Sequence, residues 1–569
     1  MSVVELTAYA LGDLARVGAG AEAVLPVRYD GPVALIGPVV GGGPGVCLVC
    51  AEDVRLAAQG TAVPRRAEGT RVGGVPSPAH GPLVDAVTRM VLADPEAYRD
   101  RVLSVRADLG TVAEHRVRPR PEGCPVCGPL PDDSADAAVV AREPAPVSPG
   151  TARGPNPLTA GDAVRDALFD QRHGPVDRLS HYGDLPLPAV SARIVTDGAG
   201  TQAGFGRTGT FAESERVALF EAVERLAGLR PRRVTTVLEA SFADLGPERA
   251  VEPTRLGLPD LPSPHVVPYA PDVRTRWVHG WSYSRGTTVA VPEHVVYWGG
   301  TPGPRFVNET SNGCGAGNSL TEAVLYGLFE VAERDAFLMA WYQRTPLPTV
   351  VARDGLALHL ADRLAQLGYR LECYDATNDL AVPTVLTLAR YTGDDPAAPR
   401  AFFAAGAGLD PQGALRSAVV EVAVDVESAA QRAHADPGEY DRERLLRMLR
   451  EPDLVRTMED HVTVNGLPEA VGRYDFLRPG DPVEMRGPEV PSDDLDAVLE
   501  HYVTAWAALD LEVIAVDLTD PVVRDRLGLH TAKVVVPGTI PMTFGERDRR
   551  THGIPRLRPT GPLLPHPFP

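Results

Sequence analysis

Apolar residues recur at helical spacing near the middle of the chain, in the segment that spans residues 311–341. The repeating positions lie three or four residues apart, which is the spacing of one helix face: Leu320, Ala323, Val324, Leu328, Val331 and Ala332. Small residues and glycines precede this pattern and lead to Asn318, a residue type that caps helices well. The pattern predicts a glycine-rich loop, able to approach a ligand closely, that leads into a long amphipathic helix.

A second helical pattern, also preceded by glycines, covers residues 204–228, and its glycine-rich start is expected to be a flexible loop. Elsewhere strand-like and helical patterns alternate. The expected helices lie at 83–103, 158–170, 356–369, 414–434 and 520–529, and the expected strands at 189–197, 370–376, 382–391, 400–409, 511–518 and 532–538. Residues 430–495 are charged and irregular. This mixture indicates an α/β (α+β) fold class.

The two long helical patterns share one acidic hexad, F-E-x-x-E-R, at residues 220–225 and 329–334. Carboxylates three residues apart lie on one face of a helix. Two such helices side by side would bring together four carboxylates: Glu221, Glu224, Glu330 and Glu333. Hard oxygen ligands in that number suit Mg2+, and neither hexad has the Glu-x-x-His companion of a di-iron site. The alternative is a solvated, salt-bridged helix face.

Length and composition exclude several classes of protein. A chain of 569 residues is expected to form about two to four domains, and its net charge of −19 argues against a nucleic-acid partner. Lys533 is the single lysine and is followed by Val534, so the chain has no P-loop; G-x-S-x-G and H-E-x-x-H are also absent. Without a signal pattern or a long apolar run, we expect a cytoplasmic protein with no membrane partner.

Four of the six cysteines form two C-x-x-C pairs, Cys47 with Cys50 and Cys124 with Cys127. Two such pairs next to Gly and Pro turns can supply a closed tetrathiolate site, which in a reducing compartment indicates structural Zn2+. Free cysteines or a redox pair are the alternative. The expected organisation is a small zinc-binding domain, a Pro/Ala-rich linker and a catalytic domain, at residues 1–130, 131–160 and 161–569.

The segment SNGCGAGNSLTEAVLYGLFEVAERDA resembles the signature of the YcaO family, ATP-dependent enzymes that activate peptide backbone amides. The resemblance implies a YcaO-type catalytic domain of mixed sheets and helices, with ATP and Mg2+ as cofactors. It implies that the four hexad glutamates hold Mg2+ and that further residues line the nucleotide: Arg207, Asn318, Glu322 and Arg334. Arg207 stands where the family often has a lysine, and Arg416 and Glu421 lie in a segment that resembles the family's third conserved block.

The chain ends in PLLPHPFP, in which Pro565, Pro567 and Pro569 alternate and hold the backbone extended. A frayed terminus is one interpretation. The terminal P-x-P-x-P also resembles the end of the azoline-forming cyclodehydratases of the family, where the tail threads toward the active site. This resemblance makes the three prolines candidate catalytic-site residues and the terminal carboxylate of Pro569 a candidate general base.

The cysteine-rich front resembles part of the adenylating-enzyme-like partner domain of these cyclodehydratases. It is too short for a whole leader-peptide-binding unit, so a separate leader-peptide-binding partner is implied, and a homodimer suits the family. The expected function is ATP-dependent conversion of Cys, Ser or Thr residues of a ribosomally made precursor peptide into thiazolines or oxazolines. The alternatives are a YcaO enzyme that makes thioamides or amidines and a non-catalytic scaffold that docks the leader peptide.

Overall fold

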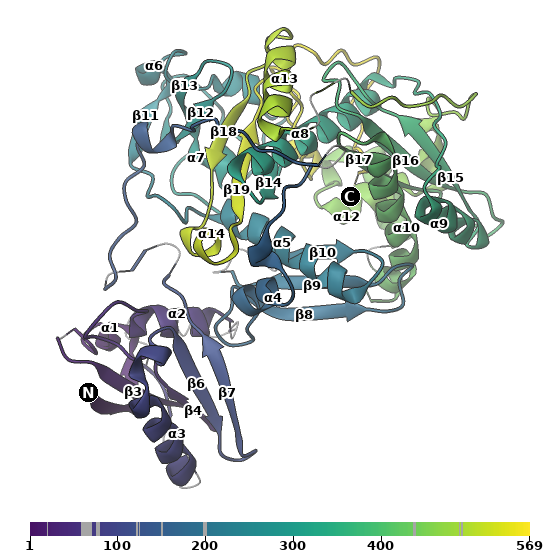
Figure 1. Cartoon of the computed structure of the whole chain (residues 1–569). Helices are drawn as coiled ribbons and strands as arrows, with labels where there is room; N and C mark the ends of the chain where they lie inside the picture. The colour runs from purple at the N-terminus through teal and green to yellow at the C-terminus, as the bar shows by residue number, and fades with distance from the viewer. Residues whose placement is uncertain are drawn as a thin grey trace.

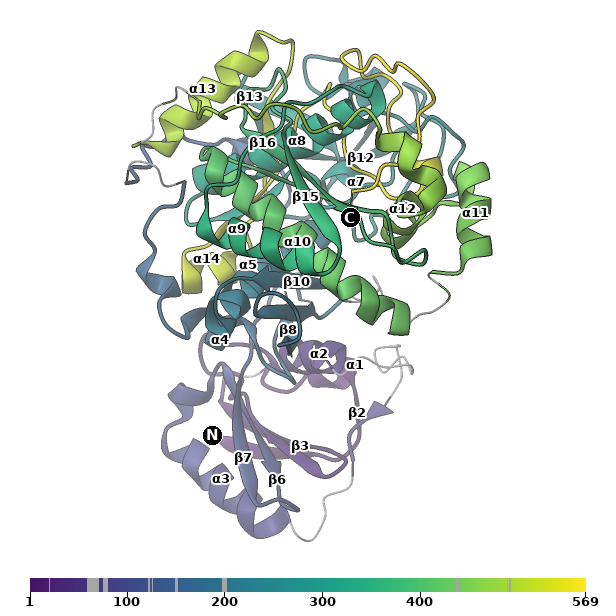
Figure 2. The same cartoon turned by 90° about the vertical axis from the view of Figure 1, so that its right-hand side faces the viewer.

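The computed structural model of the chain describes residues 1–19, 21–58, 71–74, 80–120, 123–124, 126–148, 152–196, 202–435, 438, 440–488, 490 and 493–568. Figures 1 and 2 show a smaller N-terminal region beside a larger body that contains the rest of the chain. Helices and several separate sheets make up the molecule, which confirms the predicted α/β (α+β) fold class.

A five-stranded sheet forms the N-terminal region, in the order β1 (Ser2–Leu6), β3 (Val24–Asp30), β4 (Val33–Ile36), β6 (Arg101–Arg106) and β7 (Thr111–Arg116). The helices α2 (Leu48–Ala58) and α3 (Gly81–Ala93) pack on its opposite faces. Strand β4 shows why: Val33 and Leu35 join the core beneath α2, whereas Ala34 and Ile36 join the core beneath α3. A strand buried on both faces reads as a continuous apolar run. Three short elements complete the region: β2 (Tyr9–Ala10), α1 (Leu11–Leu14) and β5 (Arg71–Val72).

Three antiparallel sheets organise the larger body. The central sheet has the order β11 (Leu238–Ser241), β12 (Arg274–Ser282), β18 (Ile514–Asp517), β19 (His530–Val535) and β14 (Cys314–Gly317), with β13 (Thr287–Pro292) paired to β12. The second contains β8 (Val176–Tyr182), β9 (Ala189–Ile194) and β10 (Gln202–Arg207), and the third contains β15 (Tyr369–Asp375), β16 (Thr384–Tyr391) and β17 (Ala401–Ala407).

The helices of the larger body are α4 (Ala163–Leu168), α5 (Phe211–Leu229), α6 (Phe242–Leu245), α7 (Glu293–Val296), α8 (Leu320–Gln343), α9 (Gly355–Gln366), α10 (Pro411–Ala435), α11 (Arg442–Arg450), α12 (Met458–Asn465), α13 (Leu495–Ala507) and α14 (Pro521–Leu527). The elements expected within 356–434 and 511–538 are confirmed, with ends that differ by a few residues. The irregular structure expected over 430–495 is wrong, because α11 and α12 lie there. Their caps form locally, since Asp441 and Thr457 accept hydrogen bonds from helix amides.

Helix α8 is the centre of the larger body. Its first half packs with α13, β18 and β19, and its second half packs with the third sheet. The pattern predicted an amphipathic helix, but α8 is buried around most of its circumference. Its partly exposed polar side chains therefore stand out, and Glu330, Glu333 and Arg334 are among them.

The glycine-rich segments that precede α5 and α8 are strands β10 and β14, and not the predicted loops. A Cβ atom on Gly206 would lie 1.8 Å from the Ser214 carbonyl oxygen of α5, and one on Gly315 would lie 2.2 Å from the Ala323 carbonyl oxygen of α8. Each strand thus lies directly on a helix backbone, which only glycine permits. The cap of α8 is Ser319, whose Oγ accepts from the Glu322 amide at 3.1 Å, and not Asn318.

Residues 131–148, within the expected linker, contain only a short 3-10 turn but pack against the larger body. Asp133 Oδ2 accepts from the backbone amide of His279 on β12 at 2.8 Å. Arg142 forms an ion pair with Asp496 on α13 at 2.8 Å. The path of this segment is therefore set by side-chain contacts together with backbone hydrogen bonds near its two ends. Across the described parts of the chain, none of the helices combines the length and apolarity needed to span a membrane.

The close contact between β10 and α5 gives a direct test. Gly206→Ala must push the strand away from the helix, so we expect the free energy of unfolding to fall by about 1–3 kcal/mol or more. Gly209→Ala is the matched control, because nothing lies within 4 Å of a Cβ atom at that position. Differential scanning calorimetry should show a lower Tm for the first variant alone; equal values would contradict the packing argument.

Candidate functional site

Two strand–helix units of the same design carry the acidic hexads. In each, a glycine-containing strand leads to a hydroxyl cap, and Thr210 Oγ1 accepts from the Glu213 amide just as Ser319 Oγ accepts from the Glu322 amide. The first hexad glutamate is the eleventh residue of its helix in both units. Both helices also contact β14. The sequence repeat is therefore a structural repeat, and it brings the two hexads to one place.

The hexad carboxylates interact across the two helices. Burial raises the pKa of Glu224 on α5 well above its usual range, and the charges of Glu330 on α8 and Glu221 raise it further. Burial also raises the pKa of Glu333 to about 8, against the opposing charge of Arg334 and with contributions from Glu421 and Glu330. The structure thus gathers the four predicted metal-binding glutamates into one electrostatically coupled cluster.

A third helix, α10, adds two more acidic side chains to this cluster. Burial raises the pKa of Glu421, and it raises the pKa of Asp425 to about 6 with a further contribution from Glu421. Arg207 on β10 lies 3.7 Å from Glu421. Arg416 faces elsewhere and pairs with Asp354 at 3.2 Å. Sequence reasoning missed Asp425, although its four-residue spacing from Glu421 places both on one helix face.

Two arginines partly balance the negative charge. Arg225 pairs with Glu221 at 2.6 Å and Arg334 pairs with Glu330 at 3.0 Å. Two buried polar atoms in this group, Glu330 Oε2 and Arg334 Nε, have no hydrogen-bond partner within the described residues. An unsatisfied acceptor beside an unsatisfied donor fits a site for a cation and an anionic group together.

The spacing of the carboxylates also bears on which ion would fit. The described residues contain two groups in which ligand atoms of three or more His, Cys, Asp or Glu side chains lie within 4.8 Å of one another. The hexad glutamates belong to neither group, so their carboxylates are more widely spaced. Mg2+ commonly binds one or two carboxylates, keeps several waters and completes its shell with phosphate oxygens. An open carboxylate cluster beside arginines therefore fits Mg2+ that carries a phosphate ligand better than an all-protein cage.

The other two predicted nucleotide-lining residues lie at the start of α8. Asn318 Nδ2 donates to the Gly154 carbonyl oxygen at 2.7 Å, and Glu322 Oε2 accepts from the Gly154 amide at 2.9 Å. Arg153 lies 3.4 Å from the same carboxylate. Eight residues separate Glu322 from Glu330, which is about 12 Å along a helix. Asn318 and Glu322 therefore form one end of the region, and the carboxylate cluster and Arg334 form the other.

The C-terminal tail runs along the second half of α8 and is buried. Trp341 Nε1 donates to the Leu564 carbonyl oxygen at 3.0 Å, and the ring of Phe568 packs 4.8 Å from that of Phe337. The Arg334 guanidinium lies 5.3 Å from the centre of the Phe568 ring. Pro565 and Pro567 are among the buried residues, whereas Pro569 lies outside the described residues. The tail thus reaches an arginine of the carboxylate cluster.

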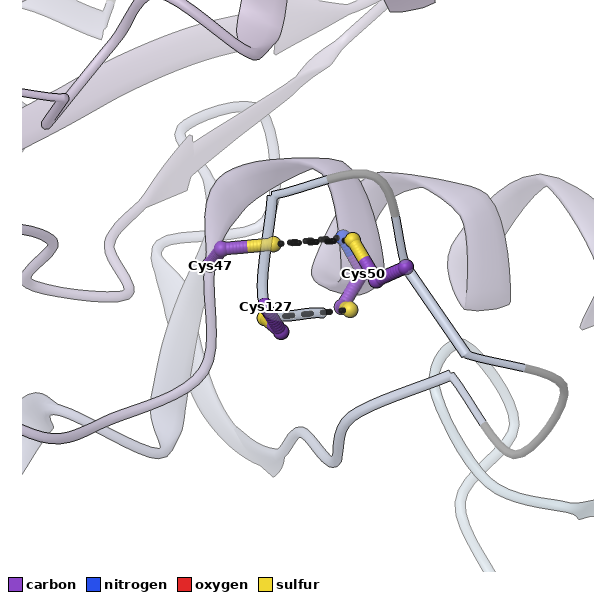
Figure 3. Close-up of side chains that lie close together, drawn as sticks. Cys47, Cys50 and Cys127 are labelled. Atoms are coloured by element: carbon purple, nitrogen blue, oxygen red, sulfur yellow. Dashed lines mark hydrogen bonds between the residues drawn. The ribbon is translucent and has the colours of Figure 1, made fainter. Parts of the chain in front are cut away.

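The two cysteine pairs meet at the start of α2. Cys47 Sγ lies 3.5 Å from Cys124 Sγ, and Cys50 Sγ lies 3.8 Å from Cys127 Sγ. A tetrahedral Zn2+ with bonds of about 2.3 Å places its sulfur ligands about 3.8 Å apart, so the spacing fits. Figure 3 shows the sulfurs of the three labelled cysteines directed into one space.

Backbone amides support thiolate character in this cysteine cluster. The Cys50 amide donates to Cys47 Sγ at 3.4 Å, and the Arg120 amide donates to Cys50 Sγ at 3.2 Å. Hydrogen bonding from Cys50 lowers the pKa of the Cys47 thiol. A cluster of four sulfurs with amide donors has the features of a structural zinc site and leaves no open ligand position.

Comparisons with known proteins place the chain in a family. The family model of the YcaO cyclodehydratases, described as ATP- and Mg2+-binding, matches residues 205–540, more than half of the chain. An uncharacterized protein of Methanothermobacter thermautotrophicus is 27% identical over 377 residues, which cover 64% of this chain and 88% of that protein.

Two solved structures resemble the whole chain. One is described as a heterocyclase in complex with substrate and cofactor. It has a TM-score of 0.74 and 21% sequence identity, and the match covers 98% of this chain and 79% of the heterocyclase chain. The other is the heterocyclase TruD, with a TM-score of 0.62 and 18% sequence identity. This match covers 94% of this chain and 73% of the TruD chain. At these identities the likeness concerns the fold.

The raised carboxyl pKa values predict a pH dependence of stability. The folded protein binds the Glu333 proton more tightly than the unfolded chain, whose value is near 4.5, so this stabilisation is complete below 4.5 and is lost as the pH rises through about 8. We expect the Tm of the ligand-free protein to fall over that range. Glu333→Gln should flatten the profile, whereas Glu500→Gln, at an exposed position on α13, should not. Identical profiles for Glu333→Gln and the wild type would contradict this assignment.

Proposed function

This chain belongs to the YcaO family of ATP- and Mg2+-binding cyclodehydratases, and on that premise we propose that it acts on a ribosomally made precursor peptide. The proposed products are thiazolines from Cys residues, or oxazolines from Ser or Thr residues. The reaction would take place in the cytoplasm, where ATP and the new peptide are both present. A separate leader-peptide-binding protein is the proposed partner.

One observation carries this proposal. The two acidic hexads, each from one of the repeated strand–helix units, lie close together and next to the C-terminal tail. The charge of Glu330 on α8 raises the pKa of Glu224 on α5 and contributes to the raised pKa of Glu333, so these carboxylates act on one another at one location. Such a cluster is costly without a cation, because burial and like charges both oppose ionisation. Glu221, Glu224, Glu330 and Glu333 are therefore the proposed Mg2+ ligands.

The two ends of the region suggest how ATP would lie. Arg207 and Arg334 stand near the carboxylates and are the proposed phosphate contacts. Asn318 and Glu322 stand about 12 Å away along α8 and are the proposed contacts of the nucleoside end. Because their polar groups have partners at residues 153–156, nucleotide binding would require that segment to share or release them.

The proposed chemistry solves one problem, which is that an amide oxygen is a poor leaving group. The substrate's thiol or hydroxyl attacks the carbonyl carbon of the preceding amide, the resulting oxyanion takes the γ-phosphoryl group of ATP, and phosphate then leaves as the ring gains its C=N bond. Bound Mg2+ would neutralise charge on the transferred phosphoryl group. The unsatisfied Nε of Arg334 can donate to an anionic oxygen at the same place.

The tail is proposed to supply the base. The proposed base is the carboxylate of Pro569, and the residue before it, Phe568, has its ring 5.3 Å from the Arg334 guanidinium. A carboxylate there could accept the proton lost by the attacking side chain. Pro565 and Pro567 remove two amide donors and stiffen the tail, and the Asn465 side chain donates to the Pro565 carbonyl oxygen at 3.1 Å.

Mass spectrometry of a cognate precursor peptide separates the candidate functions. The full-length protein, ATP, Mg2+ and the proposed partner are incubated with the peptide. Loss of one water for each modified residue, which disappears when the Cys, Ser and Thr residues of the peptide are replaced by Ala, supports an azoline-forming enzyme, whereas water loss that persists would indicate an amidine-forming enzyme. Replacement of oxygen by sulfur would instead indicate a thioamide-forming enzyme, and an unchanged mass with retained peptide binding would indicate a docking scaffold.

Removal of charge from one hexad tests the metal assignment. Glu330→Gln with Glu333→Gln keeps the side-chain shapes but removes two carboxylates, so we expect phosphate release to fall by at least about 10²-fold. Peptide binding should stay unchanged. Glu500→Gln is the control and should retain full activity. Turnover that survives the double change would show that these glutamates do not hold the metal.

A further inference from the structure

A second group of metal-binding side chains lies where the N-terminal sheet meets the larger body. His115 comes from β7, and Asp170 and His173 come from the segment that follows α4. Figures 1 and 2 show the sheet that contains β7 next to α4 and β8. One ligand atom from each of the three side chains lies within 4.8 Å of the others. The acidic hexads and the cysteine pairs contribute nothing to this group.

Neighbouring contacts fix the orientation of two of the three side chains. His115 Nε2 lies 2.7 Å from Ser104 Oγ, and its Nδ1 lies 2.9 Å from Asp170 Oδ2. Asp170 Oδ1 accepts from the backbone amides of Arg172 and His173, at 2.8 and 3.0 Å. A metal-binding histidine usually has its other ring nitrogen held in this way. His115 Nδ1 and Asp170 Oδ2 therefore face one another, and an ion bound between them would replace this hydrogen bond.

His173 is the one of these three side chains whose ring nitrogens have no hydrogen-bond partner within the described residues. It is 1% exposed, and neither Nδ1 nor Nε2 has a hydrogen-bond partner within the described residues. Its ring centroid lies 5.2 Å from that of His115. Buried imidazole nitrogens normally have a partner, so two unsatisfied nitrogens beside a carboxylate and a second imidazole point to a missing ligand.

We propose that His115, Asp170 and His173 bind a divalent transition-metal ion, Zn2+ being the best fit to two imidazoles and one carboxylate. Zn2+ ligands at about 2.0–2.1 Å from the ion lie about 3.3 Å apart in a tetrahedron, which small movements of these side chains can reach. With three protein ligands, a fourth position remains for water. The donor set differs from the four sulfurs of the cysteine site.

The electrostatic surroundings permit such an ion. Metal binding requires neutral imidazole, and neither ring nitrogen of His173 has a hydrogen-bond partner within the described residues. Two neighbouring arginines, Arg28 and Arg55, are themselves paired with Glu52, and Arg55 also pairs with Asp30. These carboxylates offset the charges of Arg28 and Arg55, whereas the charge of Arg172 acts on Asp170.

The proposed site lies between the N-terminal region and the larger body, so a bound ion would link these two parts of the molecule. The cysteine cluster lies within the N-terminal region, whereas this site takes one ligand from that region and two from the larger body. An ion here ties the two parts together at β7. Because a three-ligand site is open to solvent exchange, its metal is expected to leave before the zinc of the closed tetrathiolate.

Metal stoichiometry of the full-length protein tests the proposal. After equilibrium dialysis against Zn2+ and removal of unbound ion, plasma mass spectrometry should find two equivalents for the wild type. One should remain in His173→Ala and one in Cys47→Ser with Cys124→Ser. His181→Ala is the matched control, an exposed histidine beside Glu215, and should retain two. Ser104→Ala keeps all ligands and should weaken the second site by about 10–100-fold.

Cobalt substitution gives a readout that distinguishes the sites. The tetrathiolate site produces an intense sulfur-to-cobalt charge-transfer band, whereas the second site adds weaker visible bands that disappear in His173→Ala. If circular dichroism shows that His173→Ala is unfolded, the isosteric Asp170→Asn provides the same comparison. A wild type that takes up only one equivalent in excess Zn2+, or a folded His173→Ala that retains two, would overturn the proposal and leave a hydrogen-bonded contact between the two parts.

Discussion

Like-charged, partly buried carboxylates held close together are the constraint on which the rest of this structure depends. Glu224, Glu330 and Glu333 come from two helices, and the charge of Glu330 raises the cost of ionising both of the others. A flexible arrangement would relax by moving them apart. Helices α5 and α8 cannot do so, because each has a strand packed on its backbone and both contact β14. The rigidity of the two strand–helix units therefore keeps the carboxylates in place for a cation.

The glycines of β10 and β14 serve that rigidity. Where a strand lies on a helix at backbone distance, a Cβ atom has no room, so the residues that face the helix must be glycine while their neighbours point the other way. Gly204 and Gly206 alternate in this manner with Phe205 and Arg207. The same alternation that buries the glycines thus directs Arg207 toward the carboxylates. Packing and site geometry come from one pattern.

Local patterns in the sequence were sufficient for some features and insufficient for others. The hexads and the cysteine pairs have fixed short spacings, so the amino-acid sequence alone is enough to recognise them. The strands β10 and β14 were predicted as loops, because glycine lowers strand propensity. The reason for the glycines is the close packing of each strand on a helix that comes later in the chain, and local sequence patterns do not show that packing. Asp425 was missed since a single acidic residue on a helix usually faces solvent. His115 and Asp170 are more than fifty residues apart, and no spacing rule connects them.

The position of the N-terminal region depends on contacts that are separate from its own stability. Its sheet is held internally by the cores beneath α2 and α3 and by the cysteine cluster. Its orientation depends instead on contacts with the larger body. Residues 131–148 pack against β12 and α13, His115 contacts Asp170, and two ion pairs join Arg118 to Asp520 and Asp100 to Arg526. A metal ion at the contact of His115 with Asp170 would act on orientation while leaving the sheet intact. The N-terminal region is proposed to meet a peptide partner. A change in its orientation alone could therefore align the peptide with the carboxylate cluster, while the N-terminal sheet and the larger body both keep their folds.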